Sequence, residues 1–149
     1  MIESRANPTF KHLKHLIESS SYRRKTNEFV LETPKLILEF AAKFPNLLTH
    51  IIYADNTRVA EAFSGYKQDE IRPALLQDIS SLESPPGIMA LCTKPDPPEL
   101  DIDNMGTRFV VLDGIQNPAN AGAIIRNAVA FGLDAIFLTT DTVDLYHPQ

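Results

Sequence analysis

Hydrophobic positions near the start of the chain recur every three to four residues. The stretch NPTFKHLKHLIES contains four of them, at Phe10, Leu13, Leu16 and Ile17. This spacing places the apolar side chains on one face and predicts an amphipathic helix. Asn7 and Pro8 stand before them as a suitable N-cap and first helical residue, so we expect the helix to begin there.

Short apolar runs alternate with helical patterns further along the chain. β-Branched and aromatic residues predict strands at Glu28–Glu32 and Leu48–Ala54, and a third strand after a turn within Pro85–Thr93. Helices are predicted at Pro34–Phe44, which opens with proline, and at Thr57–Gly65, which ends at glycine. Strands that alternate with helices in this way indicate an α/β sandwich.

A stretch of poor helix and strand formers divides the chain. The sequence TKPDPPELDIDNMGT is rich in proline and acidic residues, which predicts a linker. We therefore expect a first domain over residues 1–93, a linker over 94–107 and a second domain over 108–149.

The second domain has the pattern of a β–loop–α–β unit. Phe109–Asp113 and Asp134–Thr140 are continuous apolar runs, as expected of parallel strands that are buried on both faces. Ala121–Gly132 predicts a helix between them, with Asn120 as its N-cap and Gly132 as its C-terminal stop.

Polar residues follow the first strand of this unit, from Asp113 to Asn120. Ligands of parallel sheets bind beyond the carboxyl ends of the strands, and helix N-termini suit phosphate or carboxylate groups. The loop lacks both GxGxxG and GxxxxGK[ST], so it is neither a dinucleotide fingerprint nor a P-loop. An apolar stripe is predicted on the following helix, at Ile124, Ile125, Ala128 and Val129. Arg126 lies off this stripe and one turn from Gly122, where it is either a phosphate clamp or a solvated surface arginine.

Composition and charge narrow the choice of partners. The net charge of −5 argues against nucleic-acid binding across the whole surface. Residues 1–25 nevertheless carry two acidic residues against six basic ones: Arg5, Lys11, Lys14, Arg23, Arg24 and Lys25. This basic end is either a phosphate-contacting surface or an ordinary solvated helix face, and charge alone favours the second interpretation.

The sequence offers little sign of a membrane or an oxidising environment. No run of apolar residues is long enough for a transmembrane helix, and the N-terminus lacks the apolar stretch of a signal peptide. We therefore expect a cytoplasmic protein without a membrane partner. The single cysteine, Cys92, is interpreted as a small buried hydrophobic residue rather than a nucleophile. No metal site is expected.

At the predicted loop and helix, the sequence LDGIQNPANAGAIIRNAVAFG resembles the first signature of the SpoU-type (TrmH-like) RNA ribose 2′-O-methyltransferases of the SPOUT superfamily. The matching positions are Asp113, Asn117, Pro118, Asn120, Gly122, Arg126, Ala128, Ala130, Phe131 and Gly132. The upstream segments SRANPTFKHLKHL, RRKTNEFVLE and SPPGIMALC are similar to the family's small N-terminal substrate-binding domain. Thr33 and Pro34 depart from the pattern, since relatives usually have a glycine after the glutamate.

The resemblance implies a fold and a chemistry. The fold is a ribosomal-protein-like α/β sandwich followed by an incomplete parallel β–α–β unit of a knotted SPOUT methyltransferase domain. The implied activity is methyl transfer from S-adenosylmethionine to a ribose 2′-hydroxyl of tRNA or rRNA. In this reading Arg126 orients the RNA and stabilises charge, because arginine is always protonated and is no simple base. Asn120 corresponds to the signature asparagine that shapes the same site.

The same resemblance leaves several alternatives open. The family is homodimeric, and its methyl-donor pocket and dimer interface are built mainly from two later signatures that this chain lacks. We therefore expect the cofactor-binding residues in a missing C-terminal part and expect the chain alone to be inactive. It is a fragment, the product of a disrupted gene or a genuine short protein. The alternative function is a non-catalytic RNA-binding module, and a weaker one is a nucleotide-binding α/β protein.

Overall fold

Two compact units make up the protein, Met1–Pro95 and Asp96–His147. The computed structural model describes residues 1–54, 63–97, 99, 101 and 103–148. The helix expected at Thr57–Gly65 falls mostly on residues 57–62, outside the described residues. No described helix has the length and apolar character needed to cross a membrane.

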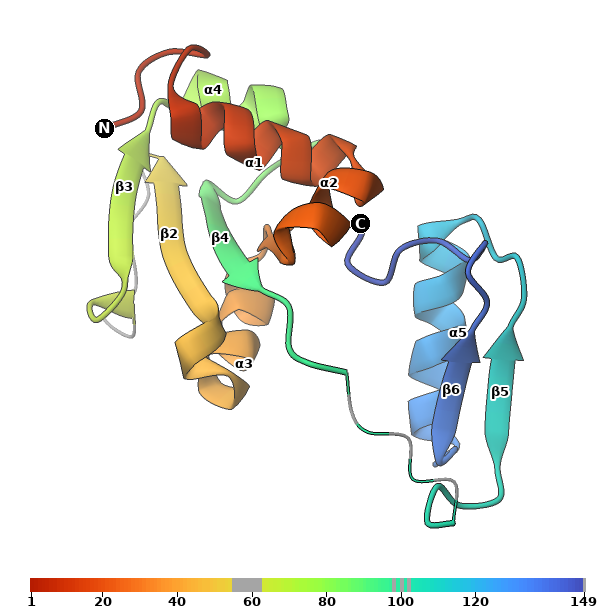
Figure 1. Cartoon of the computed structure of the whole chain (residues 1–149). Coiled ribbons are helices and arrows are strands. Elements are labelled where there is room, and N and C mark those ends of the chain that lie inside the picture. The colour runs from red at the N-terminus through yellow and green to blue at the C-terminus, as the bar shows by residue number, and fades with distance from the viewer. Residues whose placement is uncertain (55–62, 98, 100, 102, 149) are drawn as a thin grey trace. The chain divides into compact units, whose positions relative to one another are not determined.

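The first unit is built on a four-stranded mixed sheet in the order β1–β4–β2–β3. Figure 1 shows β4, β2 and β3 of this sheet side by side. Strand β4 runs antiparallel to both β1 and β2, whereas β2 and β3 are parallel. The α/β class is therefore confirmed. The elements in chain order are α1 (Pro8–Glu18), α2 (Ser20–Thr26), β1 (Glu28–Leu31), α3 (Pro34–Lys43), the 3₁₀ turn η1 (Pro45–Leu47), β2 (Leu48–Ala54), β3 (Lys67–Ile71), α4 (Pro73–Ile79) and β4 (Ile88–Thr93).

Both faces of this sheet are covered by helices. Val30 of β1 belongs to a buried apolar cluster with residues of α1 and α4. Because successive strand residues point to opposite faces, the neighbouring Phe29 points the other way, and its ring contacts Phe40 of α3 edge-on. Cys92 lies within this core, fully buried, and burial raises the pKa of its thiol to about 12. The interpretation of Cys92 as a buried hydrophobic residue is confirmed.

Local sequence accounts for the corner between α1 and α2. Asn7 caps α1 as expected, with its side chain accepting hydrogen bonds from the backbone N–H groups of Thr9 and Phe10. Ser19 ends α1 and starts α2, because its N–H donates to the carbonyl of His15 while its hydroxyl accepts from the N–H of Tyr22. A single serine therefore fixes the point at which the chain turns from one helix into the next.

Arg23 lies inside this corner and not on the surface. Its side chain is 2% exposed. Its Nη1 atom donates to the carbonyl of Leu16 at 2.7 Å and to that of Ile17 at 3.1 Å. Carbonyls in the last turn of a helix lack an intrahelical donor, and the arginine supplies one. The assignment of Arg23 to an RNA-contacting surface is therefore wrong, since its charge satisfies the end of α1.

We expect Arg23→Ala to lower the free energy of unfolding by about 2–3 kcal/mol, because it takes the donor from a buried carbonyl and a partly buried one and removes packing. Chemical denaturation followed by circular dichroism measures the change. Arg24→Ala, an exposed neighbour, is the matched control and is expected to stay within about 0.5 kcal/mol of the wild type. Equal stabilities for the two variants would contradict the role assigned to Arg23.

The second unit is a parallel β–α–β unit. Strands β5 (Phe109–Leu112) and β6 (Ala135–Leu138) pair in parallel, and α5 (Pro118–Ala130) connects them. The expected β–α–β order is thus confirmed. Gly132 has a left-handed φ of 64° and ends the helix as predicted. The N–H of Gly132 donates to the Val129 carbonyl and that of Leu133 to the Ala128 carbonyl, the pattern of a Schellman motif.

Two expectations about burial in this unit are wrong. Phe109 and Val111 are 53% and 54% exposed, so β5 is not buried on both faces. The two strands form a sheet of their own, and residues that alternate away from its covered face meet solvent. On α5, Ala121 and Ala128 are buried, whereas Val129 is 71% exposed and lies outside the buried stripe.

Candidate functional site

The loop after β5 is held by the segment that follows β6. Gly114 adopts a left-handed φ of 61°, and its N–H donates to the Thr139 hydroxyl at 3.1 Å. The Thr142 hydroxyl donates to the carbonyl of Leu112 at 2.9 Å. These bonds join the carboxyl ends of the two strands, so the loop that starts α5 has a fixed position.

Asn117 and not Asn120 caps α5. The Asn117 side chain accepts from the N–H groups of Ala119 at 2.8 Å and of Asn120 at 3.1 Å. Pro118 follows as the first helical residue, and its fixed φ suits that position. The prediction of Asn120 as N-cap is wrong because this Asn–Pro pair begins the helix one turn earlier. Asn120 is exposed in the first turn, and its side chain is not used by the cap.

A small cavity of about 70 Å³ lies beside the first two turns of α5. Gly122 and Ile125 line it from the helix, and Val143 and Leu145 line it from the segment after β6. A Cβ atom added at Gly122 would meet no other atom within 4 Å. The surface next to Gly122 is therefore open.

Arg126 lies one helical turn after Gly122 and is exposed. Within the described part of the chain, its guanidinium forms no ion pair and no hydrogen bond. Six residues separate it from Asn120, which corresponds to roughly 9 Å along the helix axis and about 120° around it. The helix thus presents the two side chains on different sides. A bound molecule as large as a nucleotide is needed to contact both.

The six basic residues of the N-terminal end fall into three groups. Arg23 is buried, as described above. Arg5 is exposed and pairs with Asp78 at 3.0 Å. The remaining four are on the surface of α1 and α2 and are named here the basic corner: Lys11, Lys14, Arg24 and Lys25.

Most of the charge of the basic corner is not neutralised by neighbouring acids. Lys14 lies 3.8 Å from Glu18, at the long end of the range for an ion pair between exposed groups. Lys11, Arg24 and Lys25 are exposed and pair with no carboxylate among the described residues. Two short helices therefore present several free cations in a net-negative chain.

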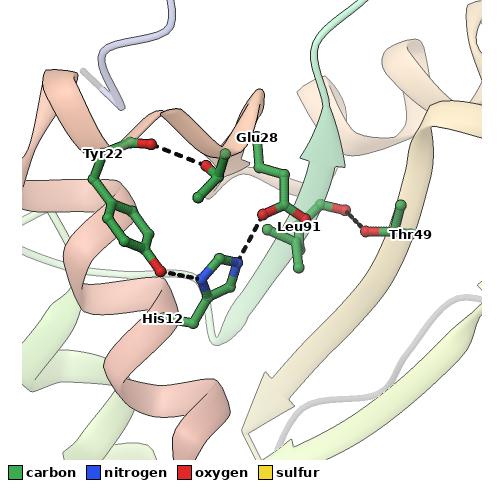
Figure 2. A network of polar contacts seen from close by, with 6 residues as sticks. His12, Tyr22, Glu28, Thr49 and Leu91 are labelled. Atoms are coloured by element: carbon green, nitrogen blue, oxygen red, sulfur yellow. Dashed lines mark hydrogen bonds and ion pairs between the residues drawn. The ribbon is translucent and has the colours of Figure 1, made fainter. Parts of the chain in front are cut away.

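A polar network that the sequence analysis missed lies beside the basic corner (Figure 2). The Nδ1 atom of His12 on α1 shares a hydrogen bond of 2.9 Å with the Tyr22 hydroxyl. The Nε2 atom of the same ring lies 2.9 Å from a carboxylate oxygen of Glu28. One imidazole thus links α1, α2 and β1. In the sequence, this network was indicated only by the position of His12 at the border of the apolar face of α1.

Comparison with known proteins agrees with this architecture. Residues 107–149 match the model of the SpoU rRNA Methylase family. The chain is 31% identical to the 23S rRNA (guanosine(2553)-2′-O)-methyltransferase RlmP of Bacillus subtilis, over 98% of this chain and 57% of that protein. It is 25% identical to the human mitochondrial rRNA methyltransferase 3, over 90% of this chain and 34% of that protein.

Solved structures of RNA methyltransferases also superpose on this chain. A crystal structure of an RNA 2′-O ribose methyltransferase superposes with a TM-score of 0.80 at 27% identity, over 99% of this chain and 58% of that one. The AdoMet-bound rRNA methyltransferase of Sinorhizobium meliloti superposes with a TM-score of 0.79 at 25% identity, over 97% and 56%. The fold is that of the SpoU-type methyltransferases. Residues 107–149 carry the sequence pattern of the SpoU methylase family, and the chain spans a little over half the length of the Bacillus subtilis protein that it matches.

We expect Asn117→Ala to destabilise the first turn of α5 by about 1 kcal/mol, because two backbone N–H groups lose their acceptor. Hydrogen exchange at Ala119 and Asn120 should accelerate by roughly fivefold. Asn120→Ala serves as the matched control, since it removes the neighbouring amide and leaves the cap intact. The same protection at Ala119 in Asn117→Ala as in the wild type would contradict the cap assignment.

Proposed function

We propose that this protein is an RNA 2′-O-ribose methyltransferase that uses S-adenosylmethionine and acts on rRNA. The observation that carries the proposal is the similarity to rRNA methyltransferases across 98% of the chain, through both units. The relatives named above are rRNA enzymes, which favours rRNA over tRNA as the substrate.

Arg126 is the residue of this chain that the chemistry needs. A ribose 2′-hydroxyl is a weak nucleophile, and it must lose its proton as it attacks the methyl group. A guanidinium cannot take that proton at neutral pH, but it can hold the adjacent phosphate and the ribose in position. The side chain of Arg126 is exposed and has no partner among the described residues, and it lies beside the open Gly122 surface, which suits this role. Asn120 contributes a polar group at the start of the same helix.

S-Adenosylmethionine supplies the methyl group in this family. The cavity beside α5 holds about 70 Å³, whereas pockets for ligands of that size are usually about 300–1,000 Å³. The residues that line this cavity therefore do not form the donor pocket by themselves. We assign to this chain's residues the binding and orientation of RNA, and we derive no step at the methyl donor from them.

We propose a different function for each of the two units. Residues 1–93 form the RNA-binding domain, with a ribosomal-protein-like fold, 94–107 the linker and 108–149 part of the methyltransferase domain. The division of the chain between Pro95 and Asp96 supports this assignment. The homodimer is proposed from the family resemblance, and the cytoplasmic location is proposed from the sequence features given above.

The basic corner is the proposed phosphate-contacting surface of the first domain. Lys11, Arg24 and Lys25 are exposed and have no acidic partner among the described residues, whereas Lys14 is partly exposed and lies near Glu18. Arg23 is excluded because it is buried, and Arg5 contributes less because Asp78 neutralises it. Contacts between exposed cations and phosphates release counterions, so the affinity should fall steeply with salt.

Substitution of all four basic-corner residues by glutamine should weaken binding to an rRNA fragment and reduce the slope of log affinity against log salt by roughly three. Filter binding over a series of salt concentrations measures both quantities. The control is the double variant Lys35→Gln/Lys43→Gln on α3, which removes exposed lysines elsewhere in the same unit. An unchanged slope in the fourfold variant would remove the basic corner from the proposed interface.

Arg126→Ala should reduce kcat/KM for methyl transfer by roughly 100-fold or more, because a positioned charge near the reacting ribose is lost. Arg126→Lys should recover part of the rate, since it keeps the charge but not the bidentate geometry. The assay follows labelled methyl transfer to rRNA by this chain joined to the C-terminal part that the family resemblance implies, both for the wild type and for each variant. The neighbouring Asn127→Ala, exposed on the same helix, is the matched control. Absence of transfer by the wild-type protein would overturn the proposed function itself.

A further inference from the structure

Two aromatic rings lie together within the basic corner. The His15 ring of α1 and the Tyr22 ring of α2 have centroids 5.3 Å apart and are tilted by 43°. His15 is exposed and Tyr22 is half-buried. Neither ring is used by the proposed phosphate contacts or by the α5 site.

The Tyr22 ring is held in one orientation. Its hydroxyl is bonded to His12, which is in turn paired with Glu28 of β1 (Figure 2). Tyr22 also packs against the buried apolar cluster of the first unit. Such a ring loses little conformational freedom when a second planar group stacks on it, which favours its use as a binding surface.

Cations flank the ring pair on both helices. Lys11 precedes His15 by four residues on α1, and Lys25 follows Tyr22 by three residues on α2, so each lysine lies on the same side of its helix as the ring. Both lysines are exposed and have no acidic partner among the described residues. The arrangement combines two neighbouring, mutually tilted aromatic rings with positive charge on either side.

We propose that His15 and Tyr22 form a stacking subsite for an unpaired nucleobase of the RNA, with Lys11 and Lys25 contacting the phosphates on either side of it. This inference rests on the proposed RNA-binding function and adds a preference to it. Bases inside a duplex already stack on one another, so only a loop, a bulge or an end can place a base on these rings. The subsite therefore directs the first domain to single-stranded parts of a folded RNA.

The ring variants test the subsite directly. His15→Ala and Tyr22→Leu should each lower the affinity for a hairpin RNA with an unpaired loop by roughly five- to 100-fold. Both should leave the salt slope and the affinity for a blunt duplex of equal length unchanged, because stacking is not a counterion effect. Tyr22→Phe keeps the ring and should retain most of the affinity. Tyr66→Leu, another half-buried tyrosine of the same unit, is the matched control.

A fluorescent base analogue gives a second measurement. 2-Aminopurine placed in the hairpin loop should be quenched on binding to the wild-type chain and not on binding to His15→Ala. His15 is exposed, so this variant tests the proposal even if Tyr22→Leu fails to fold. Wild-type affinity for the hairpin in His15→Ala, with quenching retained, would overturn the subsite. In that case a loss in the basic-corner variant would leave RNA binding standing, whereas a wild-type chain that binds no RNA would remove both proposals.

Discussion

The buried guanidinium of Arg23 is the contact on which the arrangement of the first two helices depends. It donates to the last-turn carbonyls of α1 while belonging to α2, so neither helix can shift without breaking a buried hydrogen bond. The neighbouring residues Arg24 and Lys25 remain exposed because Arg23 faces inward. The charge of Arg23 stabilises the corner between the two helices, and its inward position determines where Arg24 and Lys25 lie on the surface. The position of Tyr22 relative to α1 follows from the same constraint.

Much of the fold was predictable because local signals agreed with one another. Asn7 and Pro8 mark the start of α1, and Leu48–Ala54 is a strand with the bounds expected from its apolar run. Four described elements escaped prediction: α2, η1, β3 and α4. The strand β3, Lys67–Ile71, is largely polar because it lies at the edge of the sheet. Helices α2 and α4 have seven residues each and η1 has three, so they are too short to show helical periodicity.

The candidate site was predictable in part. The loop and helix after β5 lie where the sequence placed them, and Arg126 is exposed and unpaired within the described chain. The position of the cap was missed because two asparagines stand three residues apart, and only the proline after Asn117 decides between them. The burial of Arg23 could not be read from charge, since its acceptors are carbonyls that every sequence has. The link between His12 and Glu28 depends on tertiary contact.

The buried position of Cys92 determines when its thiol can react. It is the only cysteine, it lies on the central strand β4, and its proton is held far more tightly than in a free thiol. Oxidants and alkylating reagents attack the thiolate, which is scarce in the native state. This sulfur therefore stays inert in the folded molecule and becomes reactive when the sheet opens, which makes it a built-in reporter of unfolding.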